Sequence, residues 1–157
     1  MQIDASPSSS AGFSLGEVRI ERVGISRYAE VQALNRAVFG DDRVIFRLDR
    51  TDLTFLVAYH EQTPIGFKVG YGESEPTFYS AKGAILEPYR RRGVARQLLA
   101  RLMDEARAMD YRRFAYDTFP NKHPGMTVMG LAEGFKVTAA GYNAAYRDYR
   151  IRFEKRL

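Results

Sequence analysis

One stretch of the sequence decides the fold: YRRRGVARQLL, which occupies residues 89–99. An apolar, strand-like segment over residues 78–86 precedes it, and Glu87-Pro88 ends that strand. From Val94 onward the apolar residues recur at helical spacing, which predicts a helix over residues 93–109. A strand, a tight turn and a helix in this order leave the first N–H groups of the helix without partners.

The turn has the features of an anion-binding site. Unpaired N–H groups and the positive end of the helix dipole attract negative charge. Gly93 and Ala95 leave room for a phosphate to approach the backbone, and Arg90, Arg91 and Arg92 add charged donors at its rim. The turn therefore predicts a pyrophosphate site. The alternative is a solvated, arginine-rich helix start that binds no ligand.

Length and composition indicate one domain. The chain has 157 residues, of which 45% are hydrophobic, so it can bury one core but is too short for two ordinary domains. The first residues have neither a basic start nor an apolar core, so we expect no secretory signal. We expect residues 1–14 to form a disordered tail and residues 15–157 to form the single domain.

The absence of cysteine removes several classes of site. The chain contains no Cys and only two His, so disulfides, thiolate metal sites and a cysteine nucleophile are excluded. Neither His60 nor His123 has an obvious second ligand beside it, so no metal site is expected. No apolar run is long enough to span a membrane, and we expect a soluble, cytoplasmic protein with no membrane partner.

The net charge of +5 and a pI near 9.6 favour an anionic partner. Nucleic acid would require a broad basic stripe, whereas a ligand of the coenzyme A type needs only a local cluster such as Arg90 to Arg92. The basic residues near the C-terminus alternate with apolar ones, which indicates a solvated strand face more than a binding patch.

Hydrophobic periodicity gives the expected order of elements, β-α-α-β-β-β-α-β-α-β-β. The expected strands are Val18–Val23, Leu53–Tyr59, Ile65–Tyr71, Thr77–Leu86, Arg112–Thr118, one that begins at Phe135, and Tyr146–Glu154. The expected helices begin at Ser26, Arg43, Gly93 and His123, and the second of these is a short one that ends at Arg50.

The spacing Arg90-x-x-Gly93-x-Ala95 after a strand resembles the acyl-CoA signature of the GCN5-related N-acetyltransferase (GNAT) superfamily, and the chain resembles its small bacterial members. The order of elements and the pair Gly134-Phe135 also match that family. The resemblance implies an α/β (α+β) fold with a mixed, mostly antiparallel twisted sheet of about seven strands, flanked by about four helices.

The resemblance further implies acetyl-CoA as cosubstrate. Its pyrophosphate would lie on the turn formed by Arg90, Arg91, Arg92, Gly93, Val94 and Ala95. Its pantetheine arm would lie where the strands Thr77–Leu86 and Arg112–Thr118 splay apart, on main-chain groups of Ile85 and Leu86. Asn121 is either a further contact to the cofactor or a turn cap.

The implied reaction is direct attack of a primary amine, on a small molecule or a peptide, in a ternary complex. Many family members carry a tyrosine as general acid four residues before the Gly of Gly-Phe, but that position is Gly130 in this chain. Tyr116 or Tyr142 could supply the proton instead, water could do so, or catalysis has been lost.

The candidate general bases are Glu73 and Glu75, in the loop before the cofactor strand, and Asp117. The acceptor pocket is expected between residues 39–52 and the loop at residues 71–76. Three functions compete: an N-acetyltransferase, a catalytically silent acyl-CoA-binding module and a basic nucleic-acid-binding domain. A monomer and a homodimer are both compatible with the sequence.

Overall fold

The computed structural model describes residues 13–157, so most of the expected tail lies outside the described residues. Phe13 packs edge-to-face against His60 and Tyr89, and the packed part of the chain therefore includes it. The helices are α1 (Tyr28–Phe39), α2 (Val94–Ala108) and α3 (Pro124–Ala132). The strands are β1 (Val18–Val23), β2 (Thr54–His60), β3 (Thr63–Gly72), β4 (Thr77–Ile85), β5 (Arg113–Thr118), β6 (Lys136–Asn143) and β7 (Asp148–Arg156).

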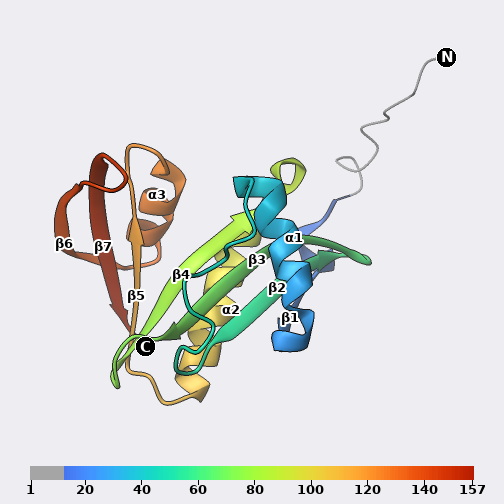
Figure 1. The fold of residues 1–157 in the computed structure, drawn as a ribbon, viewed down its shortest axis with the longest axis horizontal. Coiled ribbons are helices and arrows are strands. Elements are labelled where there is room, and N and C mark those ends of the chain that lie inside the picture. The colour runs from blue at the N-terminus through green and yellow to red at the C-terminus, as the bar shows by residue number, and fades with distance from the viewer. Residues whose placement is uncertain (1–12) are drawn as a thin grey trace.

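The strands form one seven-stranded sheet in the order β1-β2-β3-β4-β5-β7-β6. Neighbouring strands are antiparallel except for β4 and β5, which are parallel. The helix α2 connects these two strands and crosses one face of the sheet, as a parallel connection requires (Figure 1). The expected mixed, mostly antiparallel sheet is confirmed.

The sheet separates two apolar clusters. On one face, Val31 and Leu34 of α1 pack with alternate residues of β2 and β3, such as Val57 and Phe67. On the other face, α2 packs on a second cluster that continues through Phe114 and Phe153 to α3. Burying both faces of the central strands explains why β2 reads as a nearly continuous apolar run.

The expected short helix from Arg43 to Arg50 is wrong. Among residues 13–157 there are three α-helices, and residues 40–53 form an irregular loop. The side-chain amide of Asn35 in α1 donates to the carbonyl of Asp41 at 2.7 Å, and the Asp41 carboxylate accepts from the amide of Arg43 at 2.7 Å. These side-chain bonds hold residues 41–43 in a turn, so apolar spacing alone is a poor guide there.

Strands β4 and β5 are paired only over part of their lengths. Their parallel register runs from Thr77 opposite Arg113 to Ser80 opposite Tyr116. The register between β3 and β4 shifts just after that point, because Gly70 pairs with Ser80 but Val69 pairs with Lys82. This bulge bends β4 away from β5, and the two strands then diverge (Figure 1). The resulting splay leaves residues 81–85 of β4 without a strand on the β5 side.

Candidate active site

The turn before α2 exposes a set of free amides. Gly93 is the N-cap of α2 with φ of 86°, and no side chain caps the helix. The first amide to bond back is that of Gln97, which donates to the Gly93 carbonyl at 3.1 Å. The amides of Val94, Ala95 and Arg96 therefore have no acceptor within the helix. A diphosphate fits such a cradle, because glycine supplies the left-handed backbone and the amides supply donors.

The arginines of the turn are placed differently from one another. Arg90 folds back, and its Nε donates to the carbonyl of Ile85 at 2.8 Å, which ties the turn to the end of β4. Arg91 is exposed and has a positive φ of 60°. The guanidinium of Arg92 lies over the ring of Phe13, 5.2 Å from its centroid. Arg90 is thus partly a structural residue, while Arg91 lies on the solvent side of the turn.

The main chain of β4 offers bonding groups to the splay. The amide of Leu86 donates to the carbonyl of Ile65 in β3 at 2.8 Å, so it is already used within the sheet. Successive residues of a strand direct their main-chain groups to opposite sides, so those of Ile85 and Gly83 point into the splay. The Ile85 carbonyl accepts from Arg90, so its amide is the group left for the splay, and Gly83 is a position that the sequence did not single out. Contacts of Ile85 and Leu86 with the pantetheine arm stay predictions.

Asn121 follows β5 but is already engaged. Its side-chain amide donates to the carboxylate of Asp148 at 3.0 Å, which joins the end of β5 to the hairpin of β6 and β7. This contact links two segments of the chain and is neither a helix cap nor a turn cap, and a role of Asn121 in cofactor binding stays a prediction.

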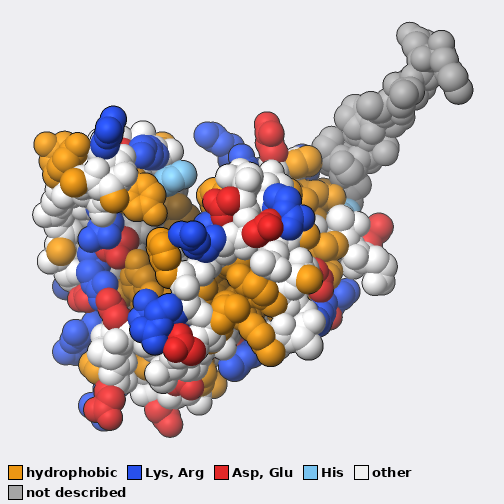
Figure 2. Space-filling model, viewed as in Figure 1, with side chains coloured by type: hydrophobic (Ala, Val, Ile, Leu, Met, Phe, Trp, Pro, Cys, Tyr) orange, Lys and Arg blue, Asp and Glu red, His pale blue; other side chains and the backbone are white. Residues whose placement is uncertain are grey.

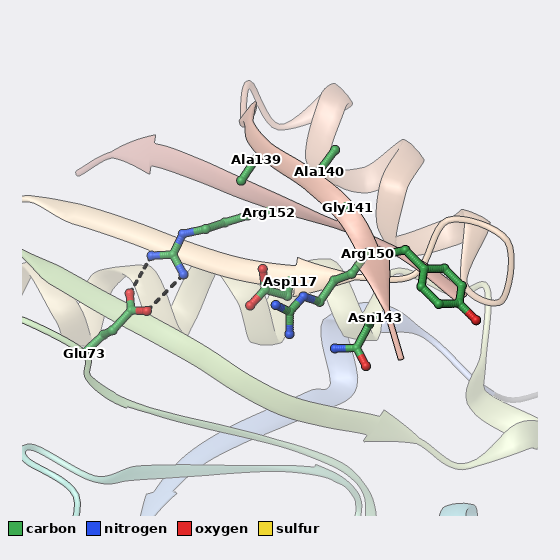
Figure 3. A pocket seen from close by; sticks show the side chains of 9 residues that line it. Glu73, Asp117, Ala139, Ala140, Gly141, Asn143, Arg150 and Arg152 are labelled. Atoms are coloured by element: carbon green, nitrogen blue, oxygen red, sulfur yellow. Dashed lines mark hydrogen bonds and ion pairs between the residues drawn. The ribbon is translucent and has the colours of Figure 1, made fainter. Parts of the chain in front are cut away.

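A pocket of about 380 Å³ opens on the side of the sheet opposite α2 and α3, over β5, β7 and β6. Its lining residues are Glu73, Asp117, Ala139, Ala140, Gly141, Tyr142, Asn143, Arg150 and Arg152. Asp117, Arg150 and Asn143 point into the same space, as Figure 3 shows. Basic and acidic side chains mix on the surface over β6 and β7 (Figure 2). The pocket therefore suits a polar ligand that carries charge.

Two carboxylates of this pocket have different surroundings. Both oxygens of Glu73 bond to the guanidinium of Arg152, at 3.0 and 2.5 Å (Figure 3). Asp117 accepts one hydrogen bond from the hydroxyl of Tyr79 at 2.7 Å. Burial, followed by this bond to a carboxylate, raises the pKa of Tyr79, so the phenol remains the donor. Asp117 keeps an oxygen for a ligand, while Arg152 occupies both oxygens of Glu73.

The position of Asp117 links the pocket to the splay. Tyr116 is the last residue of β5 that pairs with β4, so Asp117 is the first residue after the strands diverge. A ligand arm lying in the splay would end beside this carboxylate.

This pocket coincides only in part with the position expected for the acceptor pocket, which stays a prediction. Glu73 of the loop at residues 71–76 does line the pocket, but residues 39–52 do not, and β6 and β7 supply the remaining wall. Arg150 and Arg152 were expected on a solvated strand face. The side chain of Arg152 is 23% exposed and contacts Glu73 and Glu154. Sequence alternation could not show which face of β7 meets the pocket.

Tyr116 occupies the space next to Gly130. Its hydroxyl donates to the carbonyl of Met126 in α3 at 2.9 Å, and burial raises its pKa. A Cβ atom on Gly130 would overlap this hydroxyl and would lie 3.1 Å from the ring of Phe153. The phenol of Tyr116 therefore reaches the root of the side chain that a tyrosine at position 130 would have. Tyr142 is 59% exposed and packs on Tyr149. A catalytic role for Tyr116 or Tyr142 stays a prediction.

This overlap predicts strong coupling between the two positions. Gly130→Ala should destabilise the protein by about 1–3 kcal/mol, because the methyl group forces Tyr116 or α3 to shift. Tyr116→Phe alone should cost about 1 kcal/mol through the lost bond to Met126. In the double variant the oxygen is gone, so the total loss should be smaller than the sum of the single losses. Urea unfolding of the four proteins measures this, and strictly additive losses would contradict the overlap.

Comparisons with known proteins agree with this geometry. The family model "Acetyltransferase (GNAT) family" matches residues 20–127. No match is found among curated protein sequences. The IAA acetyltransferase from Bacillus cereus shares the fold with a TM-score of 0.76 at 18% identity, covering 89% of this chain and 99% of the other.

Two further solved structures show the same fold. For the ribosomal-protein-S18-alanine N-acetyltransferase from Escherichia coli the TM-score is 0.71 at 12% identity, with 88% of this chain and 93% of the other covered. For a GNAT family acetyltransferase from Elizabethkingia anophelis with acetyl-CoA bound the TM-score is 0.67 at 14% identity, with 90% and 99% covered. The family match and the shared architecture lead to one conclusion: the chain belongs to the GNAT family of acetyltransferases, whose cosubstrate is acetyl-CoA.

Proposed function

We propose that the protein transfers an acetyl group from acetyl-CoA to a primary amine by direct attack in a ternary complex. The observation that carries the proposal is the position of Asp117, at the start of the splay and on the wall of the polar pocket. This placement allows a cofactor from one side and an amine from the other to meet at one carboxylate.

The residues of the turn before α2 and of strand β4 bind and orient the cofactor. The free amides of Val94, Ala95 and Arg96 hold the diphosphate, with Arg91 at the rim. The main-chain groups of Gly83 and the amide of Ile85 pair with the pantetheine arm as an added strand would. Acetyl-CoA, when bound, supplies an acyl group activated as a thioester.

Asp117 acts on the acceptor. Its carboxylate attracts the ammonium form of the amine and takes its proton, which leaves a neutral nucleophile. Tyr79 holds the carboxylate through the bond at 2.7 Å, and the ion pair of Glu73 with Arg152 fixes the adjoining wall. Glu73 as general base stays a prediction, but Arg152 competes for both of its oxygens.

Arg150 narrows the class of acceptor. Its side chain points into the pocket beside Asp117 and has no hydrogen-bond or ion-pair partner among residues 13–157 (Figure 3). A guanidinium in this position favours an acceptor that carries a carboxylate or phosphate a few bonds from its amine. Amino acids have this chemistry, as do amino-sugar phosphates.

Release of free thiol from acetyl-CoA, measured over a panel of amines, tests the proposal. Matched pairs that differ only in the anionic group, such as an amino acid and its amide, test the role of Arg150. We expect the charged member of a pair to have the lower KM, and Arg150→Gln to remove that difference. Absence of thiol release with every amine, while acetyl-CoA binds, would favour the silent binding module that Gly130 suggests.

A further inference from the structure

Strand β3 carries a buried lysine that the reaction described above does not use. Lys68 lies between Phe67 and Val69, which both pack on the α1 side of the sheet, so Lys68 faces the α2 side. It is 7% exposed. The sequence already carried the signal, since a lysine interrupts the apolar run over residues 65–71.

The ammonium of Lys68 is unpaired. It has no hydrogen-bond or ion-pair partner within the described chain, residues 13–157. Burial is the sole cause that lowers the pKa of Lys68, to about 8, since no neighbouring charge contributes. A buried ammonium without a partner costs free energy of folding. A ligand that bonds to the ammonium would offset this cost, and such groups occur at functional sites.

The end of the side chain lies at Gly83. Lys68 is opposite Gly83 in the register of β3 and β4. A Cβ atom on Gly83 would be 3.5 Å from both Cγ and Nζ of Lys68, so the lysine lies across this glycine. Gly83 is exposed and directs its main-chain groups into the splay. A side chain at position 83 would cover the ammonium, whereas glycine leaves it open to whatever occupies the splay.

We propose that Lys68 is the proton donor for the coenzyme A thiolate that leaves during acetyl transfer. The inference rests on the proposed function and supplies the proton that Gly130 cannot. Lys68 starts the reaction as an ammonium, which is its main form at neutral pH.

The step balances as follows. The acceptor ammonium first gives one proton to Asp117, which passes it to solvent. The neutral nitrogen then forms a bond to the acyl carbon and gives its second proton to Asp117. The carbon–sulfur bond breaks with its electron pair on sulfur, and Nζ of Lys68 passes one proton to that sulfur. After the products leave, the Lys68 amine takes a proton from solvent and Asp117 returns one. No oxidant or further reactant is required.

The first measurement is the pKa of the thiol of bound coenzyme A. The ultraviolet absorbance of the thiolate gives this pKa as pH is varied. A neighbouring ammonium stabilises a thiolate, so we expect this pKa to be lower on the wild type than on Lys68→Met by about one unit or more. Lys82→Met is a matched control, because Lys82 precedes Gly83 but faces the α1 side, where its ammonium donates to the Arg43 carbonyl. That variant should leave the thiol pKa at the wild-type value.

The second measurement follows Lys68 by NMR of lysines labelled at the side-chain carbon next to nitrogen. Bound coenzyme A should raise the pKa of Lys68, whereas desulfo-coenzyme A, which lacks the sulfur, should not. With an acceptor that the wild type acetylates, Lys68→Met should have a kcat about 100-fold lower than the wild type, which is within the range for general acid catalysis. Lys68→Arg keeps the charge but transfers protons poorly, so it should restore the thiol pKa more than kcat.

The outcomes separate this inference from the proposed function. An unchanged thiol pKa in a folded Lys68→Met protein that binds coenzyme A would overturn the role of Lys68. If the thiol pKa depends on Lys68 but no amine is acetylated, the contact stands and the proposed transferase activity fails. Melting curves and the affinity for desulfo-coenzyme A confirm that each variant is folded and that the diphosphate turn is intact.

Discussion

Replacing Gly93 by glutamate is expected to abolish measurable binding of acetyl-CoA. The new carboxylate would lie at the N-terminus of α2, where the diphosphate must accept bonds from the free amides, and would repel it. Gly93 also has φ of 86°, and a Cβ atom on it would be 3.0 Å from Leu15, so added bulk meets resistance. Calorimetry should show a loss of at least about 100-fold in affinity, equivalent to about 2.7 kcal/mol.

Gly93→Asn is the matched control for this variant. Asparagine tolerates a left-handed backbone better than other residues and is neutral. It carries the same steric burden near Leu15, so its affinity should remain within about tenfold of the wild type. Circular dichroism and melting curves show whether each protein is folded. A folded Gly93→Glu protein with wild-type affinity would mean that the diphosphate binds elsewhere.

Asp117→Asn is expected to lower kcat/KM for the amine about 100-fold or more. The amide cannot take a proton and does not attract an ammonium, but it has nearly the same shape and can still accept the bond from Tyr79. A 100-fold loss corresponds to about 2.7 kcal/mol of activation free energy. The loss should shrink as pH rises, because a growing fraction of the free amine is already neutral. Acetyl-CoA affinity should not change.

Two further variants make the interpretation of Asp117 specific. Asp104→Asn removes an exposed carboxylate on α2 that pairs with Arg107, and it should retain full turnover. Glu73→Gln breaks the ion pair with Arg152 and tests the other candidate base. If Glu73→Gln costs more than Asp117→Asn and shows the same recovery at high pH, Glu73 is the base instead.

Periodicity and turn chemistry predicted most of the fold. The strand over residues 18–23 was predicted correctly from its apolar residues, of which Val18 and Ile20 pack on the α2 side and Val23 on the α1 side. The helix spacing after Gly93 was correct because one face of α2 is buried. The loop over residues 40–53 was predicted incorrectly because its backbone is held by the side chains of Asn35 and Asp41, a contact that depends on the fold of α1.

The candidate site could be predicted from the sequence only in part. The turn at Gly93 could be predicted because all of its parts are contiguous. The pocket could not, because Glu73, Asp117 and Arg152 come from three distant segments and meet only through the sheet register. Lys68 carried a usable signal, since a charge in a buried strand requires an explanation, but its nearness to Gly83 depends on the register of β3 and β4.

The short seam between β4 and β5 has a mechanical consequence. The sheet has two parts, one formed by strands β1, β2, β3 and β4 and the other by β5, β7 and β6. Four residue pairs between β4 and β5 join the two parts. We expect the amides beside this short pairing to be among those that brief opening motions expose to solvent. A cofactor bound in the splay would contact both parts of the sheet and slow hydrogen exchange along β4 and β5 together. The protein would then be most rigid with the cofactor bound, which is the state in which the reacting groups must keep their relative positions.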